Sequence, residues 1–285
     1  MRTVSKDLDV PRYRDASGAA RIAGSPYAAP LVERLAQAVT ERHPEYRYAT
    51  NLVSTEAAVP LLCFGGSLLS VLTRPYNRDE QVPFKKIVGV HPATVRIARI
   101  TPLDIYVHES NALTALERSD TPRVFLSGDP AGDLDLWSQL GLGGALGAQR
   151  IDTIASAEHR HFLSGGVKAS GSVEQVVRLT TTTATDQQTL DALAANPAGI
   201  AVAPAGLGRE GVRPVGLAAA FPRRLLLVLR RRRDGFAEPA AVELARYALS
   251  EAGQAVADEL APRFARLTAD DLGTARAELE GREVR

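Results

Sequence analysis

Cysteine is nearly absent from this chain of 285 residues. The only cysteine, Cys63, lies in an apolar run, so no disulfide can form within the chain. Cysteine usage therefore leaves the redox compartment open. We expect Cys63 to be a small buried hydrophobic residue.

Long hydrophobic runs and an excess of charge of one sign are also missing. No stretch reaches the roughly 20 apolar residues that a membrane span requires, so we expect no membrane span. The formal net charge is only +1, whereas nucleic-acid-binding proteins usually carry a clear basic excess. The composition therefore disfavours a nucleic-acid partner.

The first residues, MRTVSKDLDVPRYRDASG, lack the apolar core of a secretion signal. Two interpretations follow from this polar start. The protein is periplasmic or secreted if a signal peptide has been removed, and cytoplasmic if Met1 is native.

Strand-like and helix-like segments alternate along the chain. Residues 20–25 predict a strand, and residues 26–44 predict an amphipathic helix that follows Ser25 as its N-cap. Residues 223–231, RRLLLVLRR, are apolar on both faces and predict a central strand. Trp137 is expected to anchor a region of loops and short helices. This alternation predicts an α/β protein whose sheets are covered by helices.

Three predicted strand-to-helix junctions carry a serine: Ser25, Ser54 and Ser156. Ligands of open α/β sheets bind at the carboxyl ends of strands, where helices start. Backbone N–H groups at a helix start also attract anions. We therefore expect one ligand to be held by several helix N-termini. At one junction Ser54 and Thr55 are followed by Glu56, an anion in the first turn.

Seven segments resemble the phosphate-binding protein of the bacterial phosphate ABC importer, a type II periplasmic binding protein. They run in the order of that family from about residue 20 to residue 268. The segments are IAGSPYAAPLVERLAQAVTERHPEY, LVSTEAAVPLL, LTRPYNRDE, VGVHPATVRIARITPLDIYVHESNAL, LWSQLGL, NPAGIAVAPAGLGREGVRPVGLA and YALSEAGQAVAD.

The resemblance implies a two-lobe type II periplasmic-binding-protein fold, each lobe a mostly parallel sheet flanked by helices. Lobe one would span residues 1–104 plus 222–285, and lobe two residues 105–221. A small polar or anionic ligand would bind in the interlobe cleft, and hinge bending would close the lobes on it. The implied partners are this ligand and, if the protein is exported, an ABC permease. No cofactor is implied.

The resemblance also implies a set of ligand-binding residues. Family members hold phosphate with backbone N–H groups, hydroxyl groups and arginine. The matching positions here are Gly24, Ser25, Tyr27, Ser54, Thr55, Arg74, Ser156, Ala157 and Glu158.

Two carboxylates depart from the pattern of the family. Glu56 lies on or beside a threonine position, and Glu158 follows Ala157 where Ser-Gly-Thr is usual. At about 4 Å and an effective dielectric constant near 20, each carboxylate facing a phosphate would cost about 4 kcal/mol. Alternatively, both side chains point away and leave only their N–H groups for the ligand. The departures make phosphate a doubtful ligand.

A second functional class stays open, namely an enzyme or an intracellular ligand sensor built on the same fold. The catalytic candidates are Glu158, His159 and Glu56, with Arg74 nearby. His159 and His161 are two residues apart, so on a helix they face differently and cannot share a metal ion. We therefore expect no metal site.

Overall fold

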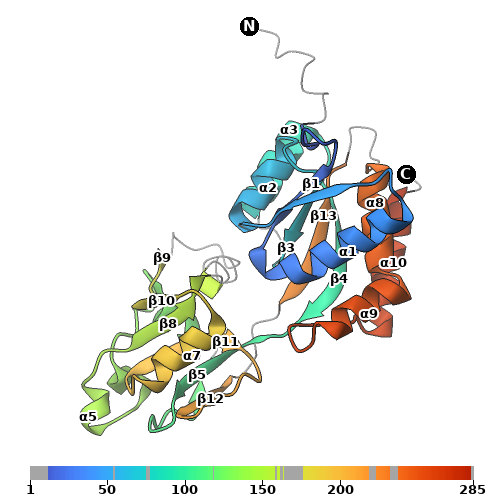
Figure 1. The fold of residues 1–285 in the computed structure, drawn as a ribbon. Coiled ribbons are helices and arrows are strands. Elements are labelled where there is room, and N and C mark those ends of the chain that lie inside the picture. The colour runs from blue at the N-terminus through green and yellow to red at the C-terminus, as the bar shows by residue number, and fades with distance from the viewer. Residues whose placement is uncertain are drawn as a thin grey trace, which may run out of the picture. The chain divides into compact units, whose positions relative to one another are not determined.

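The computed structural model describes residues 12–53, 55–74, 78–117, 119–157, 159–160, 163, 176–217, 223–231 and 237–283. The chain forms two compact units. The first unit comprises Met1–Ile100 and Arg224–Arg285, and the second unit comprises Thr101–Arg223 (Figure 1). The chain passes from the first unit to the second after Ile100, where strand β4 (Ala93–Ile100) ends.

The first unit is built on a six-stranded sheet with the order β14-β4-β13-β3-β1-β2. Its strands are β1 (Ala20–Gly24), β2 (Tyr48–Asn51), β3 (Leu69–Leu72), β4 (Ala93–Ile100), β13 (Arg224–Leu229) and β14 (Phe264–Ala265). The apolar strand β13 lies inside the sheet, which confirms its predicted central position.

Strand direction in this sheet differs from the expected mostly parallel arrangement. β1 is parallel to β2 and β3, but β13 is antiparallel to β3 and β4, and β14 is antiparallel to β4. The N–H of Arg224 donates to the carbonyl of Thr73, just after β3. Because β13 thus begins beside the end of β3, it has to run in the opposite direction.

Helices cover both faces of the first sheet (Figure 1). The helical segments of this unit are η2 (Pro26–Ala28), α1 (Ala29–Arg42), α2 (Thr55–Cys63), α3 (Arg78–Val88), α8 (Pro239–Ala248), α9 (Glu251–Glu259) and α10 (Ala269–Glu283). One core joins α1, α8, α9 and α10 to the sheet, and a second core joins α2 and α3 to the opposite face. Cys63 is buried in the second core.

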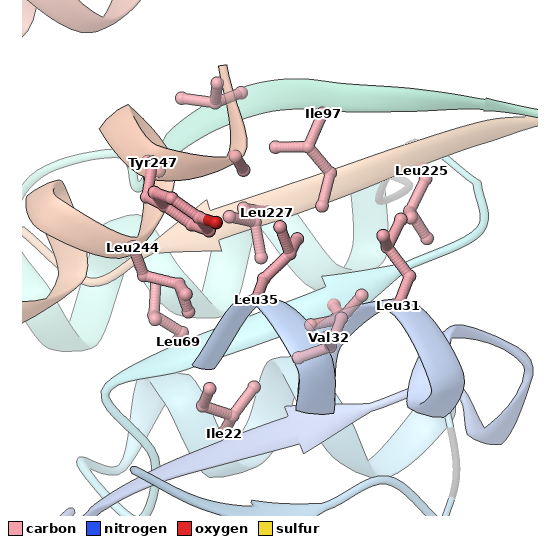
Figure 2. Packing of buried hydrophobic residues seen from close by; sticks show 14 of the residues in the cluster. Ile22, Leu31, Val32, Leu35, Leu69, Ile97, Leu225, Leu227, Leu244 and Tyr247 are labelled. Atoms are coloured by element: carbon pink, nitrogen blue, oxygen red, sulfur yellow. The ribbon is translucent and has the colours of Figure 1, made fainter. Parts of the chain in front are cut away.

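The amphipathic pattern of α1 explains how this helix is placed. Its apolar stripe, which includes Leu31, Val32 and Leu35, points at the sheet residues Ile22 and Leu225 and at other members of the first core (Figure 2). Alternate residues of β13 supply the two cores, since Leu225 and Leu227 lie in one and Leu226 and Val228 in the other. A strand that is buried on both faces in this way needs apolar side chains on both faces.

The second unit contains a six-stranded sheet with the order β10-β8-β11-β5-β12-β6 and a two-stranded sheet. Its strands are β5 (Leu103–His108), β6 (Ala115–Leu116), β7 (Leu126–Ser127), β8 (Asp152–Ser156), β9 (Val176–Val177), β10 (Thr181–Thr183), β11 (Gly199–Pro204) and β12 (Val212–Leu217). β8 runs parallel to β10 and β11, whereas β5 runs antiparallel to β11 and β12. Mixed sheets are thus found in both units.

The core of the second unit is centred on Trp137, as predicted. The helical segments here are α4 (Asp120–Phe125), η3 (Trp137–Leu140), α5 (Gly144–Gly147) and α7 (Asp186–Ala194). Trp137 has no exposed surface, and its indole Nε1–H donates to the Ala198 carbonyl at 3.0 Å. α7 packs on the opposite face through Leu190 and Leu193.

Two short features complete the fold. The segment ALTALE contains the strand β6, in which Ala115 and Leu116 pair with β12. The C-terminal helix α10 packs on the first unit through Ala275 and Leu279, which are buried in the first core. Within the described parts of the chain, no helix combines the length and hydropathy that crossing a membrane would demand.

Candidate functional site

The carboxyl ends of three parallel strands gather polar residues at one edge of the first sheet. Because β1, β2 and β3 share a direction, the segments that follow them start from this same edge. Ser25 follows β1, Thr55 opens the helix after β2, and Arg74 follows β3; all three are buried. Ser54 lies outside the described residues. The side chain of Glu56, in the first turn of α2, also lies outside them.

The junction after β1 depends on a close approach of two strands. A Cβ at Gly24 would lie 2.3 Å from the carbonyl oxygen of Val71 in β3, so only glycine fits. The Ser25 N–H donates to that same carbonyl at 3.0 Å. The Ser25 hydroxyl accepts from the N–H of Tyr27 at 3.3 Å, and Pro26 has no N–H. The N–H groups of Ser25 and Tyr27 therefore form hydrogen bonds within the unit. The Ser25 hydroxyl, which can still donate, is the polar group of residues 25–27 that a ligand could use.

The structure places Tyr27 in the core of the first unit. Its ring is 2% exposed and meets Phe264 edge to face, with centroids 5.5 Å apart. The guanidinium of Arg263 stacks on the ring at 4.0 Å. The Tyr27 hydroxyl donates to the Arg263 carbonyl at 3.4 Å. These contacts make Tyr27 a packing residue, so we leave it out of the proposed ligand set.

Arg74 is joined to Glu80 of α3 by a two-pronged ion pair. Its Nη1 donates to Glu80 Oε2 at 2.9 Å, and its Nη2 donates to Oε1 at 2.8 Å. The two side chains are only 9% and 15% exposed. Sequence reasoning missed Glu80, although an acidic residue in the first turn of the helix after an arginine turn was a usable signal. The arginine expected to hold an anion thus already holds a carboxylate.

In the second unit, Ser156 closes β8 and is 2% exposed. It lies opposite Thr183 at the end of the parallel strand β10. Ala157 begins the helical segment that follows and is exposed. Glu158 and His161 lie outside the described residues, so the direction of the Glu158 carboxylate remains an expectation.

His159 is fully buried, and its Nε2 lies 2.8 Å from Oδ1 of Asp186. Asp186 is in the first turn of α7, which follows β10 and is capped by Thr185. The hypothesis paired His159 with Glu158 and Arg74, whereas the structure gives it Asp186. Sequence reasoning missed Asp186, because a pair between two helix starts so far apart in the chain depends on how β8 and β10 associate.

The Asp186 carboxylate interacts with several polar and charged groups of the second unit. Burial raises its pKa, but the nearby polar side chains of His159 and Ser156 and the positive charge of Arg223 outweigh burial. The pKa of this carboxyl consequently lies below its ordinary value. Asp186 thereby links the segment after β8 to the start of α7, and its charge also acts on Arg223, which is 5% exposed.

This pKa shift predicts how stability responds to acid. A carboxyl whose pKa is lower in the folded protein stabilises it fully above the ordinary pKa of 3.8. That contribution is lost as the pH falls through the folded-state pKa. We expect the difference in unfolding free energy between the wild type and Asp186→Asn to shrink as the pH falls below about 4. Urea titrations at each pH would measure it, and a difference that grows on acidification would contradict the assignment.

Metal chemistry finds no support in the described residues. Among them, no group of three or more His, Cys, Asp or Glu side chains is arranged to hold a metal ion. The polar groups at the strand ends are instead hydroxyls and ion pairs, which suit a small polar ligand.

No family model and no curated protein matches the sequence. Solved structures do match the fold. An ABC-type phosphate transport receptor from Vibrio cholerae has a TM-score of 0.68 at 18% identity, covering 87% of this chain and 99% of the receptor. A possible phosphate binding protein from Planctomyces limnophilus has a TM-score of 0.66 at 12% identity, covering 92% of this chain and 97% of that protein. Identities this low establish the fold and not the ligand; the chain has the two-lobe, type II periplasmic-binding-protein fold that its sequence predicted.

Proposed function

We propose that the protein is a solute-binding protein that takes up a small polar ligand through the loops at its strand ends. The observation that carries this proposal is the placement of buried hydroxyl groups where helices begin. Ser25 and Thr55 have this position in the first unit, and Ser156 has it in the second. Hydroxyl and backbone groups at such junctions bind small polar ligands in many α/β proteins.

The similar structures support the same class of function. The Vibrio cholerae protein is a phosphate transport receptor. By analogy, an exported form of this chain would be periplasmic and would deliver its solute to an ABC permease. The analogy supplies the class of function, and the ligand has to be argued from the residues of this chain.

The enzyme hypothesis rests on Glu56, Glu158, His159 and Arg74. The described contacts give two of these side chains local partners, since Arg74 pairs with Glu80 and His159 lies beside Asp186. We put the solute-binding class first because of the buried hydroxyl groups at the helix starts.

A thermal-shift screen of small solutes followed by calorimetry tests the proposal. A ligand at about 100 times its Kd stabilises the folded state by about 2.7 kcal/mol, which is a readily measured shift in melting temperature. We expect 1:1 binding by one class of solute. Ser156→Ala should weaken it roughly tenfold, the value of one buried hydrogen bond. The exposed Ser138 of η3 provides the matched control, Ser138→Ala, which should bind normally. Equal affinity for both variants would contradict the assignment of Ser156.

A further inference from the structure

The ion pair of Arg74 and Glu80 affects which class of ligand can bind at the strand ends of the first unit. Arg74 follows β3 at the edge where Ser25 and Thr55 also lie. Its two terminal nitrogens each donate to a different oxygen of Glu80, at 2.9 and 2.8 Å. This planar, two-pronged geometry is the one in which a guanidinium also binds phosphate or sulfate. Glu80 thus occupies the Nη1/Nη2 face of Arg74, one of the faces that an oxyanion could use.

Burial makes this occupation difficult to reverse. Both side chains are largely withdrawn from water, at 9% and 15% exposure. An oxyanion that displaced Glu80 would take the Arg74 guanidinium away from a largely buried carboxylate, which is unfavourable. An oxyanion that bound beside the intact pair would meet the negative charge of Glu80 at short range. Each route lowers the affinity for a dianion.

The second unit repeats this arrangement with other residues. The Asp186 carboxylate lies 2.8 Å from the buried His159 and also interacts with the charge of Arg223. A carboxylate of the unit itself therefore lies against His159 and offsets the charge of Arg223, as Glu80 offsets Arg74. This arrangement is suited to hydrogen bonding with a ligand and poorly suited to neutralising a double negative charge.

We propose that Glu80 is a specificity-determining residue that keeps Arg74 from binding oxyanions, and that the ligand is a neutral or zwitterionic polar solute. This inference rests on the proposed solute-binding function. It predicts that the ligand carries no net negative charge. In this proposal Glu80 prevents Arg74 from binding an anion and does not orient Arg74 toward one.

Calorimetric titration with inorganic phosphate and with sulfate tests the role of Glu80. We expect both anions to bind the wild type weakly. Glu80→Gln should bind both at least about tenfold more tightly, because no carboxylate at position 80 then competes with the anion for charge-assisted hydrogen bonds from Arg74. Sulfate stays a dianion throughout the neutral range, so a parallel gain for both anions would attribute the effect to charge and not to a proton on phosphate.

Two controls separate this effect from a general change in charge. Glu243→Gln removes the same charge from another arginine–glutamate pair, in which Arg246 lies 2.6 Å from Glu243 on α8. It should leave anion binding unchanged. The double variant Arg74→Gln/Glu80→Gln should lose the gain. If Glu80→Gln does not fold, Glu80→Asp, which withdraws the carboxylate by one methylene, should show a smaller gain in the same direction.

The inference is overturned if the wild type binds phosphate tightly, or if removing the Glu80 carboxylate weakens or does not change anion binding. In those cases Glu80 would hold Arg74 in position for an anion or act in packing alone. The proposed function fails separately, if amino acids, sugars, phosphate and sulfate all leave the melting temperature of the wild type unchanged. The anion response of Glu80→Gln still decides the role of Glu80 in that case.

Discussion

Asp186→Ala should lower the free energy of unfolding by about 3 kcal/mol. Removing the carboxylate takes away the acceptor beside the fully buried His159 side chain, and the loss of a partner by a buried polar group typically costs about 1–3 kcal/mol. We expect the upper end of that range, because His159 has no exposed surface and Asp186 keeps only 26% exposure. Arg223 would lose the same neighbouring charge. Urea unfolding followed by circular dichroism at pH 7 would measure the loss.

Helix α7 supplies a matched control for this prediction. Asp191 lies on the same helix and pairs with Arg209 at 2.8 Å, but the two side chains are 49% and 42% exposed. Ion pairs on the surface usually contribute less than about 1 kcal/mol, so Asp191→Ala should have a small effect. Equal losses of unfolding free energy for the two alanine variants would show that the pair of His159 and Asp186 stabilises the protein no more than a surface ion pair does.

Trp137→Ala should destabilise the second unit by about 3–5 kcal/mol. The substitution removes a fully buried side chain of the core and leaves a cavity. It also leaves the carbonyl of Ala198 without the indole N–H that donates to it at 3.0 Å. Because Trp137 is the only tryptophan, its fluorescence cannot follow the variant, and circular dichroism is the suitable measurement.

Two further substitutions divide this effect into parts. Trp137→Phe keeps most of the packing and loses the hydrogen bond, so it should cost roughly 1–3 kcal/mol. Val176→Ala truncates a side chain that is 62% exposed, and it should change stability by less than about 0.5 kcal/mol. A Trp137→Ala loss no larger than that of Val176→Ala would contradict the anchoring role.

Much of the architecture could be predicted because it follows from local patterns. The apolar stripe of α1 predicts burial on one face, and the all-apolar strand β13 predicts burial on both faces. The structure buries each element in this way. The mixed strand directions could not be predicted in this way. They depend on β13 entering the sheet beside the end of β3, which is a contact between distant parts of the chain.

The same distinction between local patterns and distant contacts applies to the candidate site. The sequence placed Ser25, Arg74 and Ser156 after strands, because turn and helix-start preferences act over a few residues. It could not show that Tyr27 would turn into the core, since Phe264 and Arg263 come from the far end of the chain.

The sequence by itself determined the α/β fold, the central strand and the position of hydroxyl groups at helix starts. Spacing and hydrophobic pattern are enough to specify these features. Only the tertiary structure decided which charges meet. Glu80 lies against Arg74, and Asp186 lies against His159. A buried polar group needs a partner that packing brings within reach, and sequence spacing alone does not encode that partner.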